Sequence, residues 1–333
     1  MNEIAEKLHF CSVIDSGYLS RAVLMYESLK KTGVDFHLYI FTIDERAQNI
    51  LTGLALDSVT AIPVEDVEDA ELLRVKPGRT VAEYCWTLKS PMILYLMKKF
   101  GIALCTYLDG DLYFYSSPAI LRDEMGNASI LLTPHRYTPN RDLTNVSGIY
   151  CAQYLSFKND AHGREALQWW RSKCIEWCFS GYHDGKSGDQ MYLDDWLTRF
   201  HGVHELEHPG GGLGPWNVQQ YSFQLDDGRI VGIEKRTQKQ FEVVFYHFHF
   251  VRFLDDGYVE LGDYNLSKDV IDILYVPYLR SLESVNRKIQ SIDGSFDPRG
   301  TRTRKRTPRS AITTLKRIVL GRNNIFRLKS LLA

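Results

Sequence analysis

The stretch TYLDGDLYF at residues 106–114 joins an apolar strand to two carboxylates. In an open α/β sheet, ligands bind at the carboxyl ends of the strands, which is where this pattern places Asp109 and Asp111. Carboxylates at positions i and i+2 can share one hard divalent cation, and Gly110 lets the backbone bend tightly between them. Taken alone, these residues fit either a metal site or an ordinary acidic turn.

Strands and helices alternate around this stretch. Apolar runs and helical spacing predict strands at 8–14, 36–43, 59–64 and 103–108, and helices at 18–31, 45–56 and 90–100. Farther along the chain we expect strands at 130–133, 149–157 and 241–253, and helices at 117–126, 162–178, 189–200 and 267–289. Repeated βα units indicate an α/β fold with a largely parallel sheet and helices on both faces. We predict one domain at 1–297 and an extension at 298–333.

Length and composition describe an ordinary globular protein. The chain has 333 residues, of which 44% are hydrophobic and 24% charged, which excludes collagen-like, low-complexity and disordered chains. The sequence has no apolar run of the roughly 18 residues that a membrane span needs, and its N-terminus lacks a signal-peptide pattern. We therefore expect a cytoplasmic protein.

The net charge of −1 is unevenly distributed. Residues 298–333 contain 11 basic and no acidic residues, which leaves 29 basic and 41 acidic residues in 1–297, a net charge of −12. This tail combines apolar and basic side chains, a composition that is typical of an amphipathic helix lying on anionic lipid. We predict that the tail binds the inner face of a membrane; nucleic-acid binding and plain disorder are the alternatives.

Two histidines supply further metal ligands. The run VVFYHFHF at residues 243–250 places His247 and His249 on the same face of the predicted strand. A neutral imidazole is a good ligand for Mn²⁺ or a similar ion and would complete a set with two carboxylates. In the alternative interpretation, one histidine satisfies buried polar groups while the other is exposed.

Five motifs, in order, resemble the nucleotide-sugar glycosyltransferases of the GT-A fold, and most closely glycosyltransferase family 8. They are CSVIDSGY at 11–18, LDGD at 108–111, NVSGI at 145–149, which is similar to the family's Asn-x-Gly strand entry, GDQ at 188–190, and YHF at 246–248. The resemblance covers residues 8–255. It implies a mixed, Rossmann-like sheet flanked by helices, with the basic extension outside it.

The resemblance implies two binding roles for these motifs. Asp15 and Tyr18 would hold the base and ribose of a nucleotide donor. Asp109, Asp111 and His247 would bind a divalent cation, Mn²⁺ or Mg²⁺, that bridges the diphosphate of the donor.

Other matching positions concern the reacting sugar. Asp189 and Gln190 would lie near the reacting carbon, Lys89 would contact the diphosphate or the donor sugar, and Gly110 belongs to the donor site. The resembled family retains anomeric configuration, so we expect retention, with Asp189 supporting an oxocarbenium-like transition state. An inverting route would instead need a carboxylate base, for which the candidates are Asp184, Asp194 and Asp195.

A glycine-rich stretch, HPGGGLGPWN at residues 208–217, departs from the resembled family. It matches neither a dinucleotide-binding motif nor a P-loop. Two interpretations remain. In the first, the stretch is a mobile loop over the donor, with Trp216 and Asn217 near the sugars. In the second, it is a structural turn.

Together these features predict a metal-dependent hexosyltransferase of polysaccharide biosynthesis. Its donor would be a nucleotide diphosphate sugar, with a UDP-sugar favoured, and its acceptor a glycan or a lipid-linked molecule. One alternative is an Asp-x-Asp phosphohydrolase, although that class has Thr or Val where this chain has Tyr113. The other is a non-catalytic module that binds a nucleotide sugar or a membrane.

Overall fold

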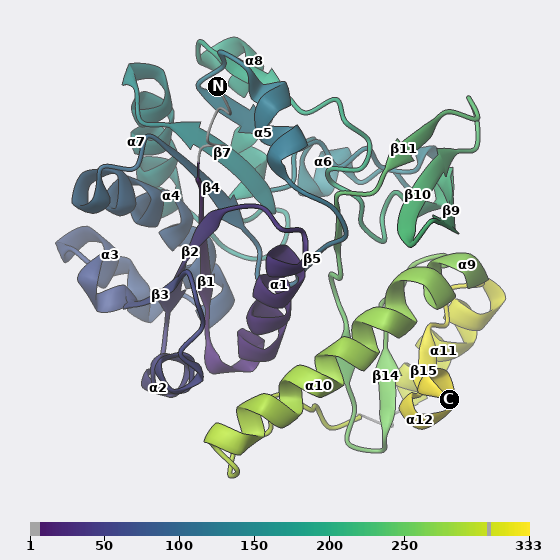
Figure 1. Cartoon of the computed structure of the whole chain (residues 1–333). Helices are drawn as coiled ribbons and strands as arrows, with labels where there is room; N and C mark the ends of the chain where they lie inside the picture. The colour runs from purple at the N-terminus through teal and green to yellow at the C-terminus, as the bar shows by residue number, and fades with distance from the viewer. Residues whose placement is uncertain (1–6, 305–307) are drawn as a thin grey trace.

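The computed structural model describes residues 7–304 and 308–333, and a seven-stranded mixed sheet forms its centre (Figure 1). The strands are Leu8–Ile14 (β1), Phe36–Thr42 (β2), Val59–Pro63 (β3), Leu104–Leu108 (β4), Ile130–Leu132 (β6), Tyr154–Lys158 (β7) and Val203–Glu205 (β8). Their order is β3-β2-β1-β4-β7-β6-β8. The first four strands are parallel, whereas β7 is antiparallel to both of its neighbours. The predicted mixed α/β sheet is confirmed.

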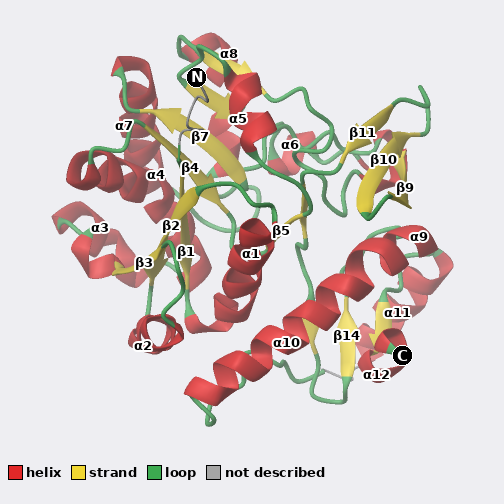
Figure 2. Cartoon of the chain, in the orientation of Figure 1, coloured by secondary structure: helices red, strands yellow, loops and turns green. Residues whose placement is uncertain are grey.

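Helices cover both faces of this sheet (Figure 2). Successive residues of a strand point to opposite faces, so Phe10 packs toward α1 (Leu19–Lys31) and α10 (Val276–Ile292). Its neighbour Cys11 packs toward α4 (Val81–Phe100) and α7 (Ala161–Glu176). The remaining helices are α2 (Glu45–Leu54), α3 (Ala70–Val75), α5 (Ala119–Met125), α6 (Thr144–Ser147), α8 (Trp196–Arg199), α9 (Lys268–Val270), α11 (Pro308–Val319) and α12 (Leu328–Leu332).

Helix α4 begins nine residues earlier than the sequence analysis predicted. Thr80 caps it, because its hydroxyl accepts from the Glu83 amide while the Glu83 carboxylate accepts from the Thr80 amide. This capping box is a stronger start signal than Pro91, which lies inside the helix and leaves one backbone carbonyl without its usual donor. The longer helix places Lys89 in its middle.

Three smaller sheets complete the structure. The predicted strand at 241–253 is divided into β11 (Gln240–Glu242), β12 (Phe245–His247) and β13 (Arg252–Phe253), and Phe250 between the last two has a positive φ of 75°. Strand β12 pairs with β5 (Leu112–Phe114). The other two sheets are β11-β10-β9, with β9 at Tyr221–Asp226 and β10 at Arg229–Glu234, and β13-β14-β15, with β14 at Tyr258–Glu260 and β15 at Ile325–Arg327.

Two other predicted elements are shorter in the structure. The strand expected at 149–157 begins only at Tyr154, and the helix expected at 189–200 is divided into a 3₁₀ turn, Gln190–Leu193, and α8. The motif NVSGI at 145–149 therefore is not the entry to a strand. It spans the end of α6 and the following Gly148, which has a positive φ of 87°.

The C-terminal extension packs against the body of the chain (Figure 1). Strand β15 pairs with β14, and basic side chains of the extension form ion pairs with acidic ones of the body, Arg299 with Glu283 and Arg304 with Asp256. Basic residues of the extension are thus paired with acidic residues of the body within one molecule. No helix among the described residues is long and apolar enough to cross a membrane.

Candidate active site

The two carboxylates of the Asp-x-Asp motif lie at the carboxyl end of β4. The amide of Asp109 donates to the Gln153 carbonyl, and the amide of Leu112 donates to the Asp109 carbonyl, which closes the turn. A Cβ atom on Gly110 would lie 3.2 Å from a methyl carbon of Ile14, so glycine allows the turn to approach β1 closely.

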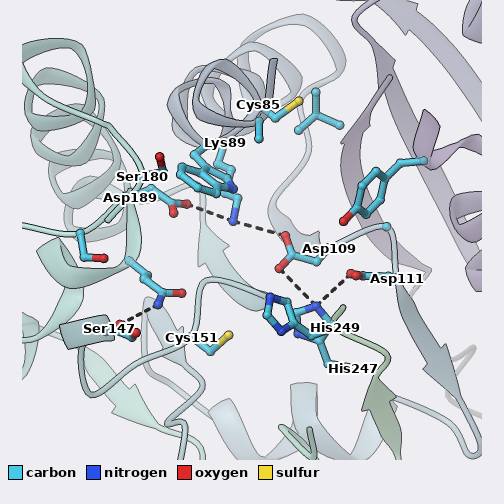
Figure 3. Close-up of a pocket in the computed structure, with 18 of the residues that line it drawn as sticks. Cys85, Lys89, Asp109, Asp111, Ser147, Cys151, Ser180, Asp189, His247 and His249 are labelled. Carbon is cyan, nitrogen blue, oxygen red and sulfur yellow. Dashed lines mark hydrogen bonds and ion pairs between the residues drawn. The ribbon is translucent and has the colours of Figure 1, made fainter. Parts of the chain in front are cut away.

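Pairing between distant strands brings His247 to this turn. In the antiparallel pair of β12 and β5, His247 lies opposite Leu112, the residue after Asp111. The Phe248 amide donates to the Asp111 carbonyl at 3.0 Å, which extends the pairing by one residue. His247 is thereby held beside both carboxylates (Figure 3).

The imidazole of His247 is held from both sides. Its Nδ1 is 2.5 Å from Gln153 Oε1, while its Nε2 is 2.9 Å from Asp111 Oδ1 and 3.9 Å from Asp109 Oδ2. If Nδ1 donates to Gln153, the Nε2 lone pair faces the carboxylates, which requires a proton or another cation between them. Burial opposes protonation, yet the Asp111 carboxylate raises the pKa of His247 well above its ordinary value. In turn, His247 overcomes the effect of burial on Asp111 and lowers its pKa to about 2.

Lys89 lies between the two groups that the sequence analysis assigned to metal binding and to catalysis. Its Nζ is 3.3 Å from Asp109 Oδ1, 3.0 Å from Asp189 Oδ2 and 2.9 Å from the Ala152 carbonyl oxygen. The side chain is only 3% exposed, and burial favours its neutral form, but the two carboxylates raise the pKa of Lys89. A charged chain therefore runs from Asp189 through Lys89 to Asp109 (Figure 3).

Asp189 and Gln190 are held at the start of the 3₁₀ turn. Trp170 Nε1 donates to the Asp189 carbonyl at 2.9 Å, and Gln190 Nε2 donates to the Ser147 carbonyl at 2.6 Å. Burial raises the pKa of the Asp189 carboxyl, while Lys89 opposes that shift.

Asp15 and Tyr18 bound the pocket at the end of β1. The Asp15 carboxylate accepts from the Tyr18 amide at 3.0 Å and so caps the 3₁₀ turn Ser16–Tyr18 (η1). The Ser16 amide donates to Asp44, which also caps α2. We call residues 15–18 the η1 loop.

These side chains surround one cavity of about 390 Å³. Of the residues that the sequence analysis assigned to the site, those lining the cavity are Asp15, Tyr18, Lys89, Asp109, Gly110, Asp111, Asp189, Gln190, Trp216 and His247. Asn217 does not line it. The pocket is therefore assembled from the ends of β1, β4 and β12, the middle of α4 and the start of the 3₁₀ turn Gln190–Leu193.

The glycine-rich stretch is a packed turn, so the interpretation as a mobile loop is wrong. A Cβ atom on Gly210 would lie 1.9 Å from the Glu242 carbonyl oxygen. Asn217 is 1% exposed; its Oδ1 accepts from the Gly214 amide, and its Nδ2 donates to the carbonyls of His135 and Gly212. Asn217 thus holds the turn together, while Trp216 packs edge-on against His247 in the cavity wall.

We expect Asn217→Ala to lower the free energy of unfolding by about 3 kcal/mol, because it leaves the buried Gly214 amide and Gly212 carbonyl without partners and removes one of the two donors to the His135 carbonyl. Urea denaturation measures this loss. Asn265→Ala is the matched control, because its side chain is exposed and its loss should change stability by less than about 0.5 kcal/mol. Equal stability of the two variants would contradict the structural role of Asn217.

The carboxylates considered for an inverting reaction lie outside the cavity lining. Asp194 accepts from the Ile149 amide at 2.7 Å, and Asp195 pairs with Arg199 one helical turn later. Asp184 is exposed in the preceding loop, with a positive φ of 47°. None of the three is placed to act on a ligand in this pocket.

The cavity has an aromatic wall formed by Tyr137, Trp216 and Tyr264, of which the sequence analysis identified Trp216 and missed the two tyrosines. His249 also lines the cavity and is bonded through Nδ1 to the Tyr264 hydroxyl at 3.1 Å. Tyr137 and Tyr264 lie outside the regular strands and helices, so no sequence periodicity marks them. Gln153, which bonds to His247 Nδ1, also lies in a turn, so no sequence periodicity marked it either.

Comparisons with known proteins place this chain among glycosyltransferase-like structures. No family model matches the sequence. The galactosyltransferase LgtC, solved with donor and acceptor sugar analogues, is 12% identical, with a TM-score of 0.53 over 83% of this chain and 96% of that chain. This likeness shows the GT-A fold that the sequence resemblance implied.

Two proteins of Bacillus subtilis (strain 168) are similar over nearly their whole length. The uncharacterised protein YfnF is 30% identical over 297 residues, 86% of this chain and 96% of YfnF. The uncharacterised protein YfnD is 31% identical over 294 residues, 86% of this chain and 93% of YfnD. The chain belongs to the family of YfnF and YfnD, and it has the GT-A fold.

Proposed function

We propose that this chain transfers a hexose from a UDP-sugar to a glycan or lipid-linked acceptor, with retention of anomeric configuration. The observation that carries the proposal is the convergence of Asp109, Asp111 and His247 in one cavity that also holds Lys89 and Asp189. The GT-A fold supports it as an analogy.

The residues present fit a divalent cation in their chemistry. Two carboxylates and one imidazole form an oxygen- and nitrogen-donor set that suits Mn²⁺, and Gln153 orients the imidazole from behind. Among residues 7–304 and 308–333, no three His, Cys, Asp or Glu side chains are arranged as a ready ligand shell. His247 Nε2 instead contacts Asp111, so a cation would take the place of the proton between them. When bound, it would stabilise the negative charge of the leaving diphosphate.

The remaining residues of the pocket then have distinct tasks. The η1 loop at the end of β1 would hold the nucleoside. Lys89 keeps Asp109 and Asp189 in fixed positions and adds positive charge beside the leaving group. Asp189 would support the positive charge that develops on the sugar ring, and the aromatic wall would receive the acceptor.

A turnover assay separates this proposal from its rivals. We expect the protein with Mn²⁺ to release UDP from one of a panel of UDP-sugars, and faster when a suitable acceptor is added. A non-catalytic module would bind UDP without turnover, and a phosphohydrolase would release inorganic phosphate from phosphate esters without any need for a nucleotide. Either result would overturn the proposal.

An exposed apolar face on α11 supports membrane binding by the extension. Ile312, Leu315 and Val319 recur on one side of this helix and are 69%, 63% and 77% exposed. Lys316 is also exposed, whereas Arg317 turns inward and pairs with Glu260. An apolar stripe flanked by basic residues suits a helix lying in an anionic bilayer surface, and we propose that this face holds the enzyme there.

We expect the double substitution Ile312→Ser with Leu315→Ser to weaken binding to anionic vesicles at least about tenfold, because two apolar side chains no longer enter the lipid. Co-sedimentation at about 0.1 M salt, where charge screening is moderate, measures the change. Leu225→Ser is the matched control, since Leu225 is 67% exposed on β9, outside the extension. Equal binding of the double variant and the control would contradict the proposal.

A further inference from the structure

We propose that the C-terminal extension is part of the active site: its Asn324 positions Tyr264 in the aromatic wall, and its residues 298–300 support the η1 loop. Both contacts belong to the extension rather than to the sheet that carries the carboxylates. The proposal rests on the proposed function only in treating the cavity as the site for donor and acceptor.

Asn324 ties down the turn that carries Tyr264. Its side chain is buried, and its Nδ2 donates to the carbonyl oxygens of Gly262 and Tyr264 at 3.1 and 2.6 Å. The backbone carbonyl of Asn324 accepts from the Leu261 amide at 2.9 Å. The turn is tight, since Gly262 has a φ of 92° and a Cβ there would lie 2.9 Å from the Tyr264 ring. One side chain of the extension therefore fixes a turn about sixty residues earlier in the chain.

Tyr264 transmits this constraint into the cavity. Its hydroxyl contacts His249 Nδ1 at 3.1 Å, and both side chains line the pocket. The His249 ring lies edge-on to Trp216, with centroids 6.0 Å apart. A shift of the turn would thus reach His249 and, through it, Trp216, not Tyr264 alone.

The start of the extension contacts the η1 loop and the first turn of α1. Ser20, fully buried at the start of α1, donates from its hydroxyl to the Pro298 carbonyl at 2.8 Å. A Cβ on Gly300 would lie 3.4 Å from the Gly17 carbonyl oxygen, so the extension passes directly against the η1 loop. Arg21 donates to the same Gly17 oxygen at 3.2 Å and closes the contact.

Helix α11 lies between these two points along the chain, at residues 308–319. The apolar face that we assign to the membrane is thus connected to the donor side of the pocket at one end and to the aromatic wall at the other. Deleting residues 298–333 would disturb both sides, and for this reason point substitutions are the cleaner test of either proposal.

The test crosses two substitutions with two readouts. Ser20→Ala removes the bond to Pro298, and Asn324→Asp keeps the shape of the side chain but loses both N–H donors; Asn324→Ala repeats the second test if the aspartate prevents folding. One readout is the affinity for UDP with Mn²⁺ by calorimetry. The other is the NMR resonance of the His249 ring, assigned with His249→Gln. Arg304→Ala is the control, because it removes an ion pair of the extension with Asp256 outside the pocket lining.

We expect Ser20→Ala to weaken UDP binding about fivefold without moving the His249 resonance, since one buried carbonyl loses its donor. The Asn324 variants should move that resonance and change UDP affinity by less than about twofold, because Asn324 bonds to the turn of Tyr264 and not to the η1 loop. The control should change neither. The proposal would be overturned if the Ser20 and Asn324 variants changed UDP affinity and the His249 resonance in the same way, or if their changes were no larger than those of Arg304→Ala. If the wild type failed to bind UDP, the proposed function would fail, but the His249 readout would still decide the role of Asn324.

Discussion

Replacing Asp111 with asparagine is expected to weaken Mn²⁺-dependent UDP binding at least about 100-fold, because one of two anionic ligands is lost. The side chain keeps its shape, and the asparagine oxygen can still accept from His247. We therefore expect the unfolding free energy in metal-free buffer to change by no more than about 1 kcal/mol. Calorimetry with MnCl₂ and UDP measures the affinity, and thermal denaturation in EDTA measures the stability.

Asp195→Asn is the matched control for Asp111→Asn. It removes the same charge from a carboxylate that is half exposed, pairs with Arg199 and lies outside the cavity lining. Its UDP affinity should equal that of the wild type. Unaltered Mn²⁺ and UDP affinity in Asp111→Asn itself would remove Asp111 from the metal site and with it the main support for the proposed function.

Asp189→Asn is expected to lower kcat by about 100- to 1,000-fold while raising the donor KM less than about threefold, because charge stabilisation is realised mainly in the transition state. The structure makes this substitution conservative in shape, and Lys89 keeps its contacts with Asp109 and the Ala152 carbonyl. Initial rates over a range of donor concentrations separate the two constants. A change in KM alone would instead assign Asp189 to ground-state binding.

The linkage in the product tests the stereochemistry. With an α-linked donor, retention gives an α-linked product, which NMR of the freshly formed product identifies. A β-linkage would reject retention. The base of an inverting reaction would then have to come from the carboxylates that line the cavity, because Asp184, Asp194 and Asp195 do not line it.

Local patterns determined the elements that surround the Asp-x-Asp motif. Strand β1 has the bounds that its apolar run predicts, and β4 ends directly before Asp109, because a continuous apolar run and a turn signal act over a few neighbouring residues. The start of α4 is also marked locally, since Thr80 and Glu83 form a capping box, although the sequence analysis predicted this helix only from residue 90. The resemblance, not periodicity, pointed to most of the predicted site residues that do line the cavity.

Only the tertiary structure decided which of these residues meet. His247 reaches Asp111 through the pairing of β12 with β5. Lys89 contacts the carboxylates of Asp109 and Asp189 from the middle of α4, a helix that is longer than predicted. The side chain of Asn217 forms hydrogen bonds with backbone groups of its own turn and does not reach the cavity. The extension likewise packs on the body, with Asn324 holding the turn of Tyr264. The free energy of such contacts depends on burial and on partners far away in the chain, and no local sequence pattern records either.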